Sequence, residues 1–284
     1  LEQAKHQGAT ACAAEVSEGI GQSVSVRLGE VETLEYNADK SFGVTVYNGQ
    51  RVGHASTADF SREAIAAAVQ AAVDIAHYTA ADDCAGLADA DDLARKVVDC
   101  DLYHPWGLSV DAAISLAQQC EQAAMDVSPS IQNSEGASIS SHQNQFVYGN
   151  SHGFIGGYAG SRHSLSCSVI AQSGDDMQRD YWYSSGRSAV DLLSPEQVGK
   201  MAAERAVQRL GAQRLKTTAC PVLFDSTVAG GLIGSVVGAV SGAALYRKNS
   251  FLLDSLGTQI LPAWVNIQEF AHLPKGAASA PFDN

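Results

Sequence analysis

The stretch Phe42-Gly43-Val44-Thr45-Val46-Tyr47-Asn48-Gly49 determines how the first third of this chain folds. Large apolar side chains alternate in it with small or polar ones, which is typical of a strand with one buried face. Asn48-Gly49 then predicts a tight turn, because both central residues of a type I′ turn need a positive φ that Asn and Gly tolerate. We therefore expect residues 51–56 to return antiparallel to residues 42–47.

Other periodic segments extend this hairpin into a mixed structure. Alternation of period two predicts further strands at 24–28, 31–36, 131–147, 153–158 and 164–171, and a short apolar run predicts one at 220–224. Apolar stripes at three- and four-residue steps predict helices after the capping residues Ser61, Ser109 and Ser194. The sequence thus predicts an α+β fold of antiparallel sheets with packed helices.

Composition divides the chain into three parts. Residues 79–105 are rich in Asp and Ala and end at Pro105, which indicates a linker, and a further change of pattern falls near Lys216. The predicted units are an N-terminal sheet with a helix over 1–85, a central α+β unit over 86–215, and the start of a C-terminal domain over 216–284.

The acidic composition argues against some classes of partner. The chain has 284 residues, with 18 Lys and Arg against 31 Asp and Glu, so its formal net charge is −13. A negative surface repels phosphate groups, and we expect neither direct nucleic-acid binding nor membrane attachment. The six cysteines form no Cys-x-x-Cys pair and no secretory leader is visible, so we expect a cytoplasmic protein.

The histidine pattern gives no catalytic or metal-binding residue. None of the eight histidines belongs to a His-x-x-x-His or His-Glu-x-x-His sequence. Zinc in a catalytic site needs about three protein ligands together with an open position for water. We therefore expect this chain to hold no cofactor of its own.

The least ordinary segment is 226–246, where twenty-one consecutive residues carry no charge. Within it Gly230, Gly234, Gly238 and Gly242 recur at every fourth position. Four-residue spacing places these glycines on one face of a helix, where a second backbone can approach closely. The segment is long enough to span a bilayer, but its Ser and Thr residues and weak hydrophobicity favour a close-packing, buried helix.

This glycine-rich segment and its surroundings resemble the TldD/PmbA family, once called modulators of DNA gyrase, and the PmbA (TldE) branch in particular. The resemblance rests on the passages 229–239, 241–242 and 245–251, on Asn150-Ser151-His152-Gly153-Phe154, and on Arg179-Asp180-Tyr181-Trp182-Tyr183. It covers nearly the whole chain, and it implies that the chain ends within a metallopeptidase-like, β-rich C-terminal domain.

The resemblance implies a subunit of a cytosolic TldD–TldE metallopeptidase that trims or degrades unfolded peptides. The metal helix of the TldD branch reads His-Glu-x-x-x-His, and an alignment through the shared Arg-Lys pair places Gly234, Ser235 and Ala239 at those positions. None of these side chains can bind zinc or act as a general base. Zinc is therefore expected in the TldD-like partner, with this chain non-catalytic and its Tyr246-Arg247-Lys248 segment near the chamber or the subunit interface.

The sequence is also compatible with two other functions. The chain could be a metallopeptidase in its own right, with ligands supplied by a C-terminal part beyond residue 284. It could also be a peptide-binding or regulatory protein without proteolysis, which binds extended segments by adding a strand to its sheets.

Overall fold

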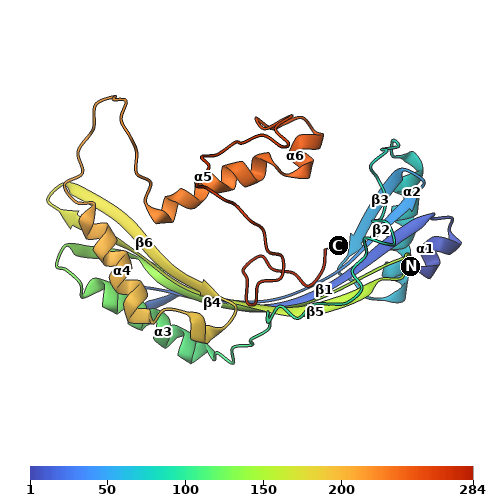
Figure 1. Ribbon diagram of the computed structural model, residues 1–284. Coiled ribbons are helices and arrows are strands. Elements are labelled where there is room, and N and C mark those ends of the chain that lie inside the picture. Colours follow the sequence, from blue (N-terminus) through green and yellow to red (C-terminus); the bar gives the residue numbers. More distant parts are fainter. Residues whose placement is uncertain (284) are drawn as a thin grey trace. The chain divides into compact units, whose positions relative to one another are not determined.

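The computed structural model describes residues 1–283 and divides them into two compact units (Figure 1). The larger unit comprises Leu1–Ala212 together with the segment that starts at Phe270, and the smaller comprises Gln213–Glu269. Across these described residues, no helix combines the length and the apolar character needed to cross a bilayer.

One antiparallel sheet of six strands forms the centre of the larger unit, in the order β3-β2-β1-β4-β5-β6 (Figure 1). Its strands are β1 (Ala11–Arg27), β2 (Glu30–Asn48), β3 (Arg51–Thr57), β4 (Ile131–Asn150), β5 (Ile155–Ser173) and β6 (Asp176–Gly186). β1 pairs with β2 on one side and with β4 on the other, so strands from the first and second parts of the chain share one sheet. The antiparallel α+β prediction is confirmed.

The strands are longer than the sequence pattern predicted. Residues 31–36 and 42–47 belong to one strand, β2, and residues 153–158 and 164–171 lie mainly in β5. Polar residues between the apolar stretches were read as breaks, but they continue the backbone pairing with their neighbours. Pairing is made by backbone groups, which every residue except proline supplies in full.

The hairpin between β2 and β3 forms as predicted, with a different turn. Asn48 pairs with Arg51, so the two central residues are Gly49 and Gln50. Only Gly49 has a positive φ (59°), which matches a type II′ turn, whose first central position is glycine.

The turn between β1 and β2 has positive φ at both central residues, Leu28 (51°) and Gly29 (81°). Leucine rarely adopts this left-handed conformation, which costs roughly 1–2 kcal/mol. The buried carboxylate of Glu121 accepts the backbone N–H groups of Leu28 at 2.9 Å and Gly29 at 2.8 Å. The Glu121 carboxylate therefore stabilises this strained turn through two hydrogen bonds.

The helices of the larger unit pack on one face of the sheet. They are α1 (Glu2–His6), α2 (Arg62–Tyr78), α3 (Val110–Met125) and α4 (Pro195–Gln208), with a short 3-10 helix at Ala189–Asp191. Cys12 of β1 lies in the core under α2, and Val24 of the same strand lies in the core under α3 and α4. Residues twelve apart on a strand point to the same face, so the opposite face carries none of these helices.

Serine hydroxyls start α2, α3 and α4 as predicted. Ser61, Ser109 and Ser194 each accept a backbone N–H in the first turn of their helix. Gln197 completes the capping box by accepting the backbone N–H of Ser194 at 3.0 Å.

Two glycines allow a helix backbone to approach its neighbour. A Cβ on Gly199 of α4 would overlap the carbonyl oxygen of Cys120 in α3, and one on Gly53 of β3 would overlap the carbonyl oxygen of Ala72 in α2. Neither contact was predicted, because single glycines carry no periodic signal.

The Gln213–Glu269 unit contains α5 (Ser226–Ala239) and α6 (Gly242–Tyr246). The predicted single helix breaks at Ser241, whose backbone is extended (ψ 139°) and whose hydroxyl accepts the N–H of Ala244 to begin α6. Gly242 therefore lies outside α5, which corrects the prediction of four glycines on one helix. Residues 220–224 do not form a strand either, because no strand among residues 1–283 pairs with their backbone.

Candidate functional site

The glycine positions of α5 are open within the smaller unit. Apart from each glycine's chain neighbours and the backbone of its own helix, no described atom lies within 4 Å of a Cβ built at Gly230, Gly234 or Gly238 of α5, or at Gly242 of α6. Large apolar side chains of the same helix are half exposed, including Leu232 at 48% and Val237 at 50%. The residues of this unit therefore supply no close-packing partner, and close packing of this helix stays a prediction.

Two of the three positions matched to the metal motif border a hollow inside the smaller unit. Its volume is about 480 Å³, and its lining consists of Ser235, Gly238, Ala239, Lys248, Asn249, Ser250 and Phe251. Ser235 and Ala239 are four residues apart, which places them on the same face of α5. Gly234 is not part of the lining.

The polar groups of this hollow are hydroxyl, amide and ammonium groups. Ser235 donates its hydroxyl to the carbonyl of Gly231, one turn earlier, at 3.0 Å. Ser250 donates its hydroxyl to the carbonyl of Ala239 at 2.6 Å and so ties the segment after α6 to the end of α5. Such groups can bind a carbonyl or an anion, but neither serine contacts a base that could activate it.

The Tyr246-Arg247-Lys248 segment lies at the end of α6, with all three residues exposed. Lys248 has a positive φ of 56°, and its backbone N–H donates to the carbonyl of Leu245 at 3.0 Å. This left-handed residue ends α6 and directs the following Asn249 and Ser250 to the hollow. Of the three predicted interface residues, Lys248 thus lines the same hollow as Ser235 and Ala239.

The side chains of α5 do not fit a catalytic zinc. The helix has the sequence Ser-Thr-Val-Ala-Gly-Gly-Leu-Ile-Gly-Ser-Val-Val-Gly-Ala, without a histidine, cysteine or acidic residue. Across residues 1–283, moreover, no three His, Cys, Asp or Glu side chains are grouped so that they could hold a metal ion.

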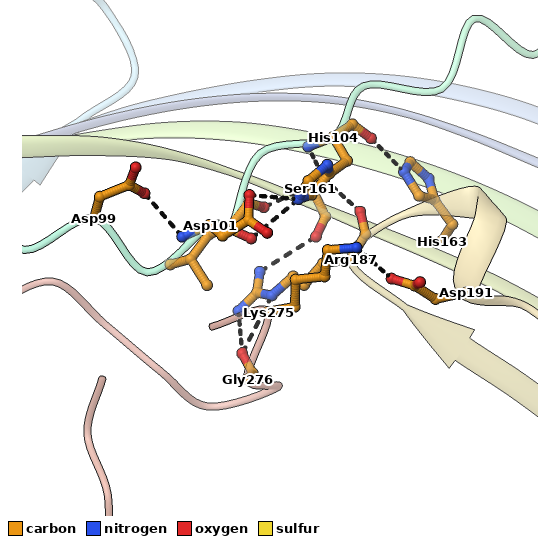
Figure 2. A network of polar contacts seen from close by, with 10 residues as sticks. Asp99, Asp101, His104, Ser161, His163, Arg187, Asp191, Lys275 and Gly276 are labelled. Atoms are coloured by element: carbon orange, nitrogen blue, oxygen red, sulfur yellow. Dashed lines mark hydrogen bonds and ion pairs between the residues drawn. The ribbon is translucent and has the colours of Figure 1, made fainter. Parts of the chain in front are cut away.

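The larger unit contains a buried polar network that the sequence did not reveal (Figure 2). His163 of β5 is fully buried, and its Nε2 lies 2.9 Å from the carbonyl oxygen of His104. A carbonyl only accepts, so Nε2 carries a proton, and Nδ1 forms a hydrogen bond with the hydroxyl of Ser141 at 3.0 Å. These two contacts fix the orientation of the imidazole ring.

The second half of the network joins segments far apart in the chain (Figure 2). The buried Ser161 hydroxyl accepts the N–H of His104 at 2.8 Å and donates to the carbonyl of Arg187 at 2.7 Å. Arg187 in turn donates to the carbonyl of Ala277 at 3.1 Å, and Lys275 pairs with Asp191 at 3.0 Å. The pKa of Arg187 is lowered, mainly by burial and to a lesser extent by the positive charge of Arg162.

This network is structural. Ser141 and His163 form a serine–histidine pair, but both residues are buried. The second ring nitrogen of His163 contacts a backbone carbonyl, whereas the histidine of a nucleophilic triad contacts a carboxylate there. The pair cannot reach a substrate. Instead, His163 and Ser161 hold His104 on the sheet, and Arg187 holds Gly276 and Ala277. Sequence spacing carried no signal for these contacts, because their partners lie 22 to 90 residues apart.

Models of one family match most of the sequence. Residues 12–76 match PmbA/TldA metallopeptidase domain 1, residues 103–210 match the central domain, and residues 217–284 match the C-terminal domain. Metalloprotease PmbA of Escherichia coli O157:H7 is 52% identical over 269 residues, and the Haemophilus influenzae homologue is 48% identical over 284 residues. These alignments cover 95% and 100% of this chain but only 60% and 63% of the relatives.

Solved structures share the fold. A modulator of DNA gyrase from Bacteroides thetaiotaomicron has a TM-score of 0.91 at 24% identity, over 99% of this chain and 64% of that one. TldE from Thermococcus kodakarensis has a TM-score of 0.72 at 15% identity, over 89% of this chain and 57% of that one. At these identities the likeness supports the fold alone.

The three family models and the PmbA relatives confirm the resemblance predicted from the glycine-rich segment. The chain therefore belongs to the PmbA/TldD family, in its PmbA branch.

Proposed function

We propose that this chain is the non-catalytic, TldE-type subunit of a heteromeric metallopeptidase that acts on unfolded peptides in the cytoplasm. Zinc is bound by a TldD-like partner subunit. The observation that carries this proposal is the residue set on α5, which contains no His, Cys, Asp or Glu. The family resemblance aligns Gly234, Ser235 and Ala239 of this helix with a His-Glu-x-x-x-His motif.

The hollow beside α5 suggests what this chain contributes to the assembly. Lys248 and Asn249 offer an ammonium and an amide group beside the motif positions, where they can hold a peptide carbonyl or carboxylate. The exposed apolar residues of α5 and its open glycine positions suit a close contact with the partner subunit. The chain would thus complete the peptide site of the partner without touching the metal.

The test uses the full-length protein, purified with and without a TldD-like subunit. We expect zinc and chelator-sensitive cleavage of an unfolded peptide only when the partner is present. Lys248→Ala should raise the KM of the assembled enzyme while its zinc content stays unchanged. Lys200→Ala, which removes an exposed lysine of α4, is the matched control and should change neither.

Three outcomes separate the alternatives. Stoichiometric zinc and peptide cleavage in the partner-free preparation would show a metallopeptidase in its own right. Peptide binding without cleavage, even with the partner present, would show a non-proteolytic peptide-binding protein. A Lys248→Ala enzyme with reduced zinc would contradict the role proposed for the hollow.

A further inference from the structure

The first part of β2 is an open edge of the sheet. β1 pairs with β2 along its whole length, from Glu30 to Tyr47, whereas β3 pairs only with residues 42–48. Residues 30–41, called here the β2 edge, therefore have a paired strand on one side only. In an antiparallel sheet every second residue of such a strand directs its N–H and C=O away from its neighbour.

All residues of the β2 edge are exposed. At about 3.3 Å per residue the edge is roughly 40 Å long, and long exposed edges pair readily with added strands. Proteins commonly protect an edge by a bulge. β2 has one extra residue, Glu32, where its register with β1 shifts between Ser25 and Val26, close to the turn. The edge between Thr33 and Asp39 is regular.

The two faces of the edge differ in chemistry. Leu34 and Tyr36, exposed at 51% and 68%, lie on the same face as Val24 of β1, with which Leu34 is in register. The other face carries Glu35 and Asp39, opposite Ser23 and Gly19 of β1. No cation of β1 therefore neutralises these two carboxylates.

The only lysine of the edge does not change this pattern. Lys40 is in register with Glu18 of β1 and lies over the ring of Phe60 at 4.9 Å. Its charge is thus placed at the far end of the edge and beside an acid. The middle of the edge presents carboxylates on one face and apolar side chains on the other.

We propose that the β2 edge binds an extended segment of another protein by strand addition, and that this segment alternates basic with apolar residues. Its lysines or arginines would lie beside Glu35 and Asp39, and its apolar side chains would lie beside Leu34 and Tyr36. A second copy of this chain is disfavoured, because antiparallel pairing of two such edges centred on Asn37 would place Glu35 opposite Asp39.

The residues of the β2 edge all belong to the larger unit, whereas the residues that carry the proposed function belong to the smaller one, so the two proposals rest on different residues. The probe is a short fluorescent peptide in which Lys and Val alternate. It should protect alternate backbone amides of residues 30–41 from hydrogen exchange and bind with a measurable anisotropy change. A Glu/Val peptide, and a Lys/Val peptide with every second amide N-methylated, should not bind.

Variants of the chain test the charge pattern. Glu35→Lys with Asp39→Lys should weaken binding of the Lys/Val peptide roughly tenfold or more, since two attractive cross-strand pairs become repulsive. Asp91→Lys with Asp92→Lys, in an exposed loop, makes the same change of net charge and should leave binding within about twofold. Unfolding curves of all variants should coincide with that of the parent, because the four side chains are exposed.

The proposal is overturned if the N-methylated peptide binds as well as the parent peptide, or if protection lies outside residues 30–41. Equal weakening by both double variants would show nonspecific attraction to an acidic protein. Dimerisation with protection of residues 30–41 in the absence of peptide would identify a second copy as the occupant.

Discussion

Glycines on the helices of the two units differ in how closely other parts of the chain approach them. At Gly199 the backbone of α4 lies against α3 so closely that a Cβ would overlap the carbonyl oxygen of Cys120. At Gly234 on α5, by contrast, no described atom apart from its chain neighbours and the backbone of its own helix lies within 4 Å of the Cβ position. A glycine pattern in sequence thus indicates where backbones can approach, but only the tertiary structure shows where they do.

The strongest test of this difference is Gly199→Ala. The added methyl group would meet the Cys120 carbonyl and lie 3.0 Å from the N–H of Ala124, and backbone atoms cannot move aside cheaply. We expect a loss of about 3 kcal/mol in the free energy of unfolding, measured by chemical denaturation. An unchanged midpoint would show that α3 and α4 are not in close contact.

A somewhat smaller effect is expected for Glu121→Ala. This substitution leaves the N–H groups of Leu28 and Gly29 without their acceptor and releases a strained turn. The free energy of unfolding should fall by about 2 kcal/mol. Leu28→Gly in the same background should restore part of the loss by removing the strain, and failure of that rescue would argue against the left-handed Leu28.

The third test concerns the pH dependence of the larger unit. Burial acts to raise the pKa of Asp180, but the N–H of Tyr181 and the guanidinium groups of Arg205 and Arg209 outweigh it, so the pKa is lowered. A carboxyl with a lowered folded-state pKa stabilises the protein above its unfolded pKa, near 3.9, and that contribution is lost as the pH falls through the folded value.

Asp180→Asn should therefore cost about 1–2 kcal/mol at neutral pH and progressively less as the pH falls below about 4. Denaturant unfolding of parent and variant across this range measures the difference. Asp92→Asn, which makes the same substitution in an exposed loop, is the matched control. A constant gap between parent and Asp180→Asn at every pH would contradict the ion pairs.

The smallest expected effect is Gly234→Ala, the counterpart of Gly199→Ala. With open space at this position, alanine should stabilise α5 by up to about 1 kcal/mol through its higher helix propensity. Thermal unfolding of the isolated chain measures this gain. Weaker association of the same variant with a TldD-like subunit would show that the open glycine positions form a contact surface between subunits. Destabilisation of the isolated chain would show that another part of the chain already covers these glycine positions.

The local elements could be predicted from sequence because their signals are local. Ser61, Ser109 and Ser194 cap helices as expected, and Gly49 forms the predicted hairpin with a different turn. Their partners lie within a few residues, so the pattern contains the whole interaction. Strand lengths were underestimated, since polar residues inside a strand are paired through their backbone alone.

The structure does not test the roles predicted for the candidate site residues. Ser235, Ala239 and Lys248 border one hollow, but the lost metal motif and the position of the basic segment near a chamber or interface stay predictions. The break at Ser241 was missed, because a single serine inside an apolar run gives no strong helix stop. Glu121 and His163 were missed as well, because their partners are distant in sequence.

The sequence by itself determined the family, the antiparallel α+β class, the helix starts and the lack of metal-ligating side chains on α5, since each depends on residue identity or short spacing. The tertiary structure alone decided that one sheet joins the two parts of the chain, that Gly199 rather than Gly234 is packed, and that β2 has an open edge. These features depend on which backbone segments are in contact. Contacts between residues distant in sequence produce no periodic pattern along the chain.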